Sequence, residues 1–363
     1  MTKHNMESFY NFLTTEIIAQ NELAGIPYDI PALPEAQFIV IPVVREAVAP
    51  ILVRNNDADD VTDMVLAGAN RVRMIASKTK GVERRRGSQI LRSLGVGGKS
   101  AVNKTFIPKG RKAGEVLDLN SFVFGDAAKG EESAIYPVHA AVLYSDAISI
   151  RPKKDLINDV FRQGGIYEDG GNFDSESKKS SNNIFTTYAV NPGTFFVQSL
   201  VIPGHRMTRA AFDHLLLSVG LAGSYGGQTA VTGTNIRTHF IGIFWGKMER
   251  SLNAPMEMLL KIGEERSVDG ILSILASEFS GQYPHSVDRK TLEETIGSLI
   301  DRFESNDPSL LSQYAVAHQK VSDLFNAWFG TSSQKNKKGK RGAQEMEGDL
   351  KEGATEGEDA VNG

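Results

Sequence analysis

The sequence predicts an α+β fold, because strand patterns and helix patterns both occur and alternate along the chain. An apolar, β-branched run at 38–53 indicates a buried strand, and Pro42 and Pro50 limit its length or place it at a sheet edge. Runs of β-branched and aromatic residues bounded by Gly or Pro indicate further strands at 139–150, 194–202 and 236–246.

Helical spacing of the apolar residues at 211–219 predicts a helix within 207–223, and a second helix is expected at about 87–94. Two β–α–β units with long insertions predict a ferredoxin-like, RRM-like core. From Asn253 to Phe329 the apolar spacing is helical, which predicts a C-terminal helical region.

Composition limits the class of protein. A chain of 363 residues with 40% hydrophobic and 23% charged residues can bury a sizeable core in one large or two modest domains. The absence of cysteine excludes disulfides, thiolate catalysis and cysteine-bound zinc, and it fits a reducing compartment. The first residues hold no apolar run of signal-peptide or membrane-span length, so we expect a cytoplasmic protein without a membrane partner.

The last residues have a different composition. A basic run at 332–341 and an acidic run at 345–359 are rich in Gly and lack aromatic residues, which predicts a disordered tail over 331–363. An alternative is an acidic arm that shields a basic groove until RNA displaces it.

Residues 71–112 contain thirteen Lys and Arg against a single acid, Glu83, in a chain whose net charge is −4. Like charges repel one another unless an anion lies across them, so this segment predicts a surface for a polyanion, with a phosphodiester backbone as the leading candidate. Within it, Gly87 and Ser88 are expected to start a helix whose first-turn N–H groups attract an anion beside Arg84, Arg85 and Arg86. An ordinary solvated basic helix is the alternative.

A glycine-rich stretch at 221–237, here called the glycine loop, is the second feature that suggests binding. Its glycines let a ligand backbone approach closely, its Ser, Gln, Thr and Asn side chains form hydrogen bonds, and Arg237 adds a cation. It has neither the spacing of a Walker loop nor that of a dinucleotide-binding fingerprint, and an ordinary tight turn is the alternative. The scattered histidines show no metal-binding spacing.

Several motifs together resemble a known family. The helix entry GVERRRGSQILRSLG, the phrase FVFGD followed by YSDA, and the paired Gly before GTNIR resemble the RAMP superfamily of CRISPR-associated proteins. The arrangement, over roughly residues 38–246, is most similar to the backbone subunit of a type I-D interference (Cascade) complex.

The resemblance implies an RRM-like palm with a basic insertion and a β-hairpin thumb that pushes an apolar wedge into the guide RNA. The implied divisions are an N-terminal extension at 1–36, a palm at 37–250 with a basic insertion at 71–140 and a thumb at 151–193, a helical region at 251–330, and the tail at 331–363. The wedge candidates are Tyr167, Phe173 and Phe185.

The implied function is to polymerise along the spacer of a guide RNA (crRNA) and to present it for pairing with target DNA or RNA. The implied partners are the guide RNA, the target, neighbouring copies of the chain and other CRISPR subunits, and RNA binding requires no cofactor. The residues expected to bind RNA are Arg71, Arg73, Lys78, Lys80, Arg84, Arg85, Arg86, Gly87, Ser88, Gln89, Arg92, Lys99, Lys104, Gly226, Gly227, Gln228, Thr229 and Arg237.

The resemblance also implies a possible cleavage site, since related backbone subunits in some complexes cut target strands with an Asp in the loop after the first strand and a divalent metal. The matching stretch, NNDADDVTDM, predicts catalytic carboxylates with Mg²⁺, and a solvated turn or helix start is the alternative reading. The candidates are Asp57, Asp59, Asp60 and Asp63.

Two other functions fit parts of the pattern. A freestanding RNA-processing endonuclease of the same superfamily would need a catalytic His or Tyr near the glycine loop. A viral-type nucleoprotein would also coat RNA, but the order of strands and glycine loop favours a palm over an all-helical shell.

Overall fold

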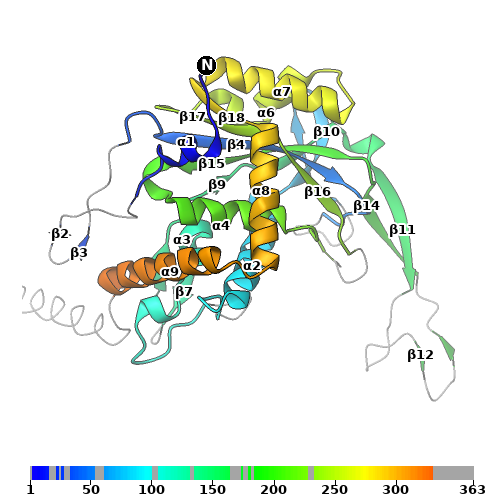
Figure 1. Cartoon of the computed structure of the whole chain (residues 1–363). Coiled ribbons are helices and arrows are strands. Elements are labelled where there is room, and N and C mark those ends of the chain that lie inside the picture. Colours follow the sequence, from blue (N-terminus) through cyan, green and yellow to red (C-terminus); the bar gives the residue numbers. More distant parts are fainter. Residues whose placement is uncertain are drawn as a thin grey trace, which may run out of the picture. The chain divides into compact units, whose positions relative to one another are not determined.

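The structure is a computed structural model of the chain, and its elements are labelled in Figure 1. It describes residues 2–15, 22–23, 26–27, 33–53, 61–99, 105–130, 135–163, 173–174, 179–180, 184–227 and 233–329. The chain divides into two compact units. The first comprises Met1–Thr15, Ala32–Gly87 and Ala141–Asp307, and the second comprises Glu16–Pro31, Ser88–Ala140 and Pro308–Gly363.

The first unit is built on a mixed sheet in the order β1-β18-β17-β4-β15-β10-β6-β5, with β16 also paired to β4 and β9 to β15. Only the β1–β18 pair is parallel among the described strands of this sheet. The strands are β1 (Thr2–Lys3), β4 (Phe38–Ala47), β5 (Asp63–Leu66), β6 (Ala69–Met74), β9 (Leu143–Tyr144), β10 (Ala147–Pro152), β15 (Phe195–Pro203), β16 (Ile236–Phe240), β17 (Gly242–Gly246) and β18 (His285–Asp288).

Helices cover both faces of this sheet because alternate residues of each buried strand point to opposite sides. Val40 and Val44 of β4 pack in the same core as apolar residues of α6 and α7, which lie above the sheet in Figure 1. Helix α4 lies below it, where residues 211–219 are all buried, and α8 packs against α4. The helices of this unit are α1 (Met6–Tyr10), α4 (Arg209–Gly220), α6 (Pro255–Ile262), α7 (Val268–Gln282) and α8 (Arg289–Glu304).

Helix α2 (Ala76–Ser93) begins in the first unit and ends in the second. The predicted helix start at Gly87 and Ser88 is wrong, because both residues lie inside α2 and their N–H groups are not in its first turn. The helix begins earlier because the carboxylate of Asp146 accepts a hydrogen bond of 2.7 Å from the Ala76 backbone N–H. This cap comes from the loop between β9 and β10, seventy positions along the chain.

The mixed α+β architecture predicted from the sequence is confirmed. The predicted strands correspond to β4, to β9 with β10, to β15, and to β16 with β17, while the helix predicted within 207–223 is α4. Strands β17, β4, β15 and β10 are neighbours in that order and all antiparallel. Helix α2 precedes β10 in the chain, and α4 connects β15 to β16.

A β-hairpin occupies the interval between β10 and β15. Strands β11 (Ile157–Gln163) and β14 (Ile184–Val190) pair antiparallel over their whole length, and the ribbon extends away from the large sheet (Figure 1). Beyond it, β12 (Phe173–Asp174) pairs with β13 (Lys179–Ser180). Among the wedge candidates, Phe173 lies on β12 and Phe185 on β14, whereas Tyr167 lies outside the described residues.

The second unit forms around the long helix α9 (Pro308–Phe329), which follows the C-terminal helices of the first unit in the chain. Ser322 and Asn326 of α9 hydrogen-bond the backbone of Gly114 at 2.9 and 2.8 Å, and Phe329 meets Tyr136 edge-on. The other elements are β2 (Glu22–Leu23), β3 (Ile26–Pro27), α3 (Leu119–Phe124), β7 (Asp126–Lys129) and β8 (Ile135–Val138). The predicted tail at 331–363 lies outside the described residues.

In the described part of the chain, no helix combines the length and the apolar character that crossing a lipid bilayer requires.

Burial of His214 on α4 predicts an acid-sensitive fold. Complete burial lowers the pKa of this imidazole from 6.5 to about 3. As the pH falls below 6.5, the imidazole therefore becomes protonated in the unfolded state while it stays neutral in the folded state. The free energy of unfolding should therefore decrease between pH 6.5 and pH 4, by up to about 1.4 kcal/mol per pH unit from this group. Urea titrations of the wild type and His214→Gln at several pH values test this. The variant should show a flatter pH dependence, and parallel curves would exclude His214 as the cause.

Candidate nucleic-acid interface

The arginine triplet lies on helix α2. Arg85 is exposed, while Arg84 and Arg86 are half-buried. Lys78 is exposed about two turns earlier on the same helix, and Gly87 is buried. Because residues 84–86 occupy three different directions around a helix, only some of them can face one ligand.

Several cations of the predicted basic surface have hydrogen bonds or ion pairs within the protein. The Arg71 guanidinium donates to the backbone carbonyls of Leu66 (3.0 Å) and Ile150, Arg73 pairs with Asp146 at 2.6 Å, and Lys80 donates to the Val142 carbonyl at 3.1 Å. Burial, together with the nearby charge of Arg84, lowers the pKa of Lys80 to about 8. The segment therefore is not one continuous row of cations available to an anion.

The remaining predicted contacts at this end of the basic segment belong to the second unit. Ser88 accepts a hydrogen bond of 2.9 Å from Asn120, and Gln89, Arg92 and Lys99 are exposed. Lys104 lies outside the described residues.

The base of the glycine loop is held tightly. Tyr225 and Asn235 exchange two hydrogen bonds of 2.8 Å between the Tyr225 backbone and the Asn235 amide. Gly226 has a φ of +81°, and a Cβ added there would lie 2.6 Å from the Leu52 carbonyl oxygen, so glycine is required. Gly227 donates its N–H to the same oxygen at 2.9 Å. The predicted contacts Gln228 and Thr229 lie outside the described residues.

Arg86 and the glycine loop line the same hollow of the first unit. This hollow, of about 530 Å³, is bordered by Arg86, by Gly223, Ser224 and Thr234 of the loop, and by Arg237 of β16. We call it the arginine hollow. Arg237 is 65% exposed and lies 3.5 Å from Glu46, and Glu293 of α8 adds one carboxylate to the lining. Two guanidinium groups beside a loop rich in backbone N–H groups and hydroxyls suit a phosphate or a short stretch of phosphodiester.

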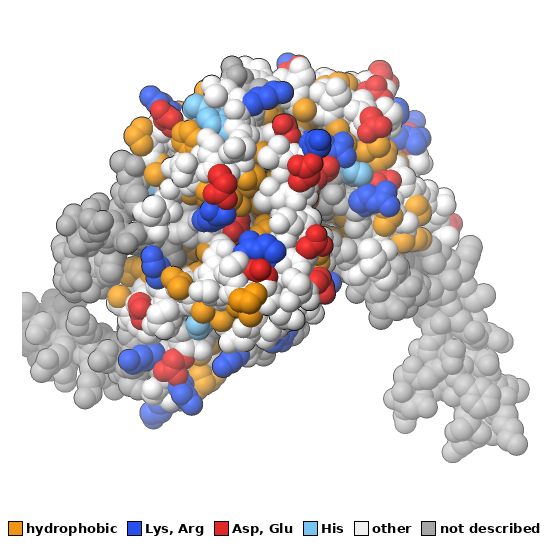
Figure 2. Space-filling view, viewed as in Figure 1, with side chains coloured by type: hydrophobic (Ala, Val, Ile, Leu, Met, Phe, Trp, Pro, Cys, Tyr) orange, Lys and Arg blue, Asp and Glu red, His pale blue; other side chains and the backbone are white. Residues whose placement is uncertain are grey.

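The face over helix α8 has a different character. Figure 2 shows Lys and Arg side chains next to Asp and Glu side chains there, in agreement with the Arg289–Glu293 and Lys290–Glu294 pairs at 2.8 and 3.8 Å. Opposite charges interspersed in this way give no net attraction for a polyanion.

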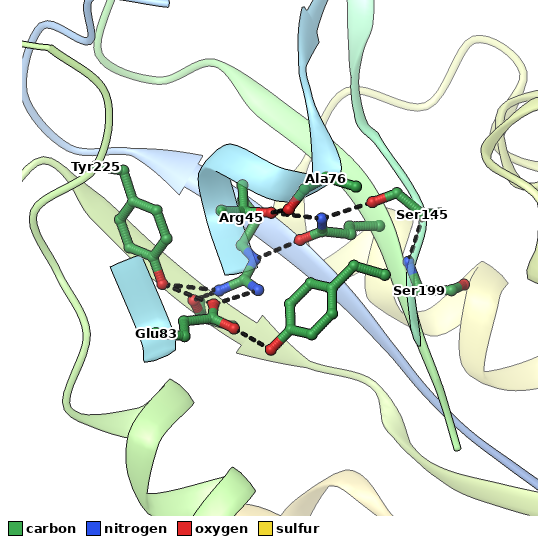
Figure 3. Close-up of polar contacts among 10 residues, drawn as sticks. Arg45, Ala76, Glu83, Ser145, Ser199 and Tyr225 are labelled. Atoms are coloured by element: carbon green, nitrogen blue, oxygen red, sulfur yellow. Dashed lines mark hydrogen bonds and ion pairs between the residues drawn. The ribbon is translucent and has the colours of Figure 1, made fainter. Parts of the chain in front are cut away.

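Next to the arginine hollow is a group of polar residues, three of them buried, that the sequence did not predict as a site (Figure 3). The Arg45 guanidinium of β4 pairs with the Glu83 carboxylate of α2 at 2.6 Å, and both side chains are completely buried. Arg45 also donates to the Tyr225 hydroxyl at 3.2 Å and to the Thr238 hydroxyl at 2.7 Å. We call Arg45, Glu83, Tyr225 and Thr238 the buried charge cluster.

Three signals in the sequence point to this cluster. Arg45 interrupts an apolar strand, Glu83 is the one acid of the basic segment, and Tyr225 directly precedes the paired glycines. A charge inside a buried strand requires a partner, because an unpaired buried charge is costly.

The hairpin and the glycine loop meet at two consecutive residues. Ile51 exchanges backbone hydrogen bonds of 3.1 and 2.8 Å with Val190 of β14, and Leu52 accepts the bond from Gly227. Val53 and Val61, which lie on either side of Asp57, Asp59 and Asp60 in the chain, belong to one core with Tyr225 and Val190. The base of the hairpin, the base of the glycine loop, Val53 and Val61 are therefore neighbours.

Of the four predicted catalytic acids, Asp57, Asp59 and Asp60 lie outside the described residues. Asp63 begins β5, where its carboxylate accepts from Lys153 at 2.5 Å and from Asn70 at 3.1 Å. Among the residues that the structure describes, no three His, Asp or Glu side chains are grouped so as to hold a metal ion. Cleavage with Mg²⁺ stays a prediction.

Comparison with solved structures supports the fold. The chain is similar to a crystal structure of Thermofilum pendens Csc2, with 14% identity, a TM-score of 0.53, and coverage of 82% of this chain and 92% of that one. Weaker likenesses are to a chain of a CRISPR RNA-guided surveillance complex (13% identity, 68% of this chain and 85% of that chain, TM-score 0.43) and to a chain of a Type IV-B CRISPR complex (16% identity, 62% and 100%, TM-score 0.39). No curated protein matches the sequence.

Comparison with protein families identifies the chain. The family described as Csc2 Crispr matches residues 26–329, which is most of the sequence. The resemblance to CRISPR backbone subunits predicted from the sequence is thereby confirmed, and with it the role of a backbone subunit in a CRISPR interference complex. The chain belongs to the Csc2 CRISPR family.

Proposed function

We propose that this backbone subunit binds the guide RNA by its phosphates and that the arginine hollow is one of its contacts. The observation that carries the proposal is that Arg86, Arg237 and the glycine loop, all predicted as RNA contacts or next to them, line a single hollow. Guanidinium groups and backbone N–H groups hold phosphates without contacting base edges. A guide held in this way keeps its bases free to pair.

The strand order supports an RRM-like palm as the support for this site. Four antiparallel strands ordered β17-β4-β15-β10, with α2 and α4 as the connecting helices, have the topology of a ferredoxin-like βαββαβ core. In this proposal the hairpin of β11 and β14 is the thumb, and one of Tyr167, Phe173 and Phe185 is its wedge. The hairpin base and the glycine loop are bonded to the consecutive residues Ile51 and Leu52. This closeness supports the proposal that both contact the same guide RNA strand.

The partners follow from the same proposal. Copies of this chain would follow one another along the guide RNA, together with other CRISPR subunits, and target DNA or RNA would bind by pairing with the guide. RNA binding uses protein groups alone and needs no metal. We place this assembly in the cytoplasm.

The proposal predicts that affinity for RNA falls steeply with salt. For a mixed-sequence single-stranded RNA, the slope of log affinity against log salt should be about −0.7 for each neutralised phosphate. Arg86→Ala and Arg237→Ala should each make the slope shallower by about 0.7. Fluorescence anisotropy titrations at four or five salt concentrations measure this.

Lys290→Ala is the matched control, because Lys290 is an exposed cation that pairs with Glu294 on α8. Its slope should equal that of the wild type. A wild-type affinity that does not change with salt, or equal slopes for Arg86→Ala and Lys290→Ala, would contradict the proposal.

A further inference from the structure

The buried charge cluster is adjacent in the chain to the three segments that supply the proposed phosphate contacts of the arginine hollow. Glu83 directly precedes the arginine triplet and stands one helical turn before Arg86. Tyr225 lies between Ser224, which lines the hollow, and Gly226. Thr238 directly follows Arg237 and itself lines the hollow. One buried guanidinium, Arg45, therefore connects all three segments that supply the phosphate contacts.

The contacts within the cluster are directional hydrogen bonds, so they fix the orientation of the side chains as well as the distances between them. The Glu83 carboxylate accepts the Tyr225 hydroxyl at 2.8 Å through the same oxygen that pairs with Arg45, and its other oxygen accepts the Tyr144 hydroxyl. The Arg45 Nε donates to Gln198 at 3.1 Å, which in turn donates to Thr79 of α2 at 3.0 Å. Helix α2 is thus tied to β4 and β15 at two successive turns, and the glycine loop is tied to α2 through Tyr225 (Figure 3).

Stability alone does not explain such a cluster. Removing two charges from water costs several kcal/mol, and replacing a buried ion pair by apolar side chains of similar volume is often neutral or stabilising. Apolar contacts, however, are not directional. A carboxylate that accepts from three donors fixes the relative positions of the segments that carry those donors. Burial and the nearby Glu83 raise the pKa of Tyr225, so its hydroxyl stays a donor at all ordinary pH values.

We propose that the buried charge cluster positions the RNA contacts: it holds α2, the glycine loop and β16 in a fixed relation, so that Arg86, the loop backbone and Arg237 contact one RNA strand together. This inference rests on the proposed function, and it adds Arg45, Glu83, Tyr225 and Thr238 as positioning residues. None of the four needs to contact RNA.

The test is a double-mutant cycle that combines Tyr225→Phe with Arg86→Ala. Tyr225→Phe removes the link from the glycine loop to Glu83 and keeps the Arg45–Glu83 pair. RNA affinity should fall about tenfold, the equivalent of about 1.4 kcal/mol. In the Tyr225→Phe background, Arg86→Ala should then cost clearly less than in the wild type, because the two contacts no longer act together.

Tyr144→Phe is the matched control. It also deletes one buried hydroxyl bonded to Glu83, but Tyr144 and its chain neighbours do not line the arginine hollow. Its melting temperature should resemble that of Tyr225→Phe, while its RNA affinity and salt slope should equal those of the wild type. Should Tyr225→Phe fail to fold, Thr238→Val combined with Arg237→Ala provides a second cycle, because Thr238 is the Arg45 partner next to Arg237.

The outcomes separate the two proposals. Salt-dependent binding by the wild type with coupling in the Tyr225 cycle supports both. If the wild type binds in a salt-dependent way but the losses of RNA affinity from Tyr225→Phe and Arg86→Ala are additive, the positioning role alone is overturned. The same holds if Tyr225→Phe and Tyr144→Phe change the RNA affinity equally. A wild type that does not bind RNA in a salt-dependent way overturns both.

Discussion

Replacing Glu83 with Ala is expected to lower the free energy of unfolding by about 3–5 kcal/mol, because it leaves the Arg45 guanidinium buried without a counter-charge. Both side chains have no exposed surface, so water cannot substitute for the lost carboxylate. The hydroxyls of Tyr144 and Tyr225 lose their acceptor in the same step. Urea unfolding followed by the fluorescence of the two tryptophans measures the change.

Two further variants make this prediction specific. Glu294→Ala removes one partner of an exposed pair on α8 and should leave the unfolding midpoint nearly unchanged. The double variant Arg45→Met with Glu83→Leu removes both charges and should recover most of the lost stability. If the double variant is as unstable as Glu83→Ala, the cost comes from packing and not from an unpaired charge.

Replacing Gly226 with Ala is expected to destabilise the protein by about 2–4 kcal/mol, since it combines a left-handed backbone with a steric clash. The φ of +81° disfavours any L side chain, and the new Cβ would lie 2.6 Å from the Leu52 carbonyl oxygen. The loop base would have to move away from Leu52. Urea unfolding and RNA titration should therefore both show a loss.

The neighbouring glycine is the control. A Cβ at Gly227 would lie 3.8 Å from Leu52, an ordinary contact, so Gly227→Ala should change stability by no more than about 0.5 kcal/mol. Equal losses for the two variants would show that the loop is sensitive to any added methyl group and not to the conformation of Gly226.

The sequence predicts well what depends on local pattern. The apolar run at β4, the aromatic and β-branched runs at β15 to β17, and the helical spacing of α4 each produce the expected element, because periodicity reports which face is buried. The glycine loop was found for a similar reason, as the chain needs Gly226 at a positive φ. The paired glycines of this loop are also among the motifs that carry the family resemblance.

What depends on distant partners could not be predicted. Helix α2 begins at Ala76 because Asp146, which is distant in the sequence, accepts a hydrogen bond from the Ala76 N–H. The residues next to Ala76 give no sequence signal for a helix start. The count of cations in 71–112 could not separate Arg86, which lines the hollow, from Arg73, which pairs with Asp146. Charge counts give no information on which side chains fold inward, and that depends on tertiary contacts.

The adjacency of Ile51 and Leu52 affects how the molecule opens. One residue holds the hairpin through Val190 and the next holds the glycine loop through Gly227. A fluctuation that detaches either residue loosens the backbone support of the other, so the amides of Val190 and Gly227 should exchange their hydrogens with solvent in a single cooperative event. A nucleic acid bound at the hairpin base would then also slow hydrogen exchange of the Gly227 amide, and one bound at the glycine loop would slow exchange of the Val190 amide.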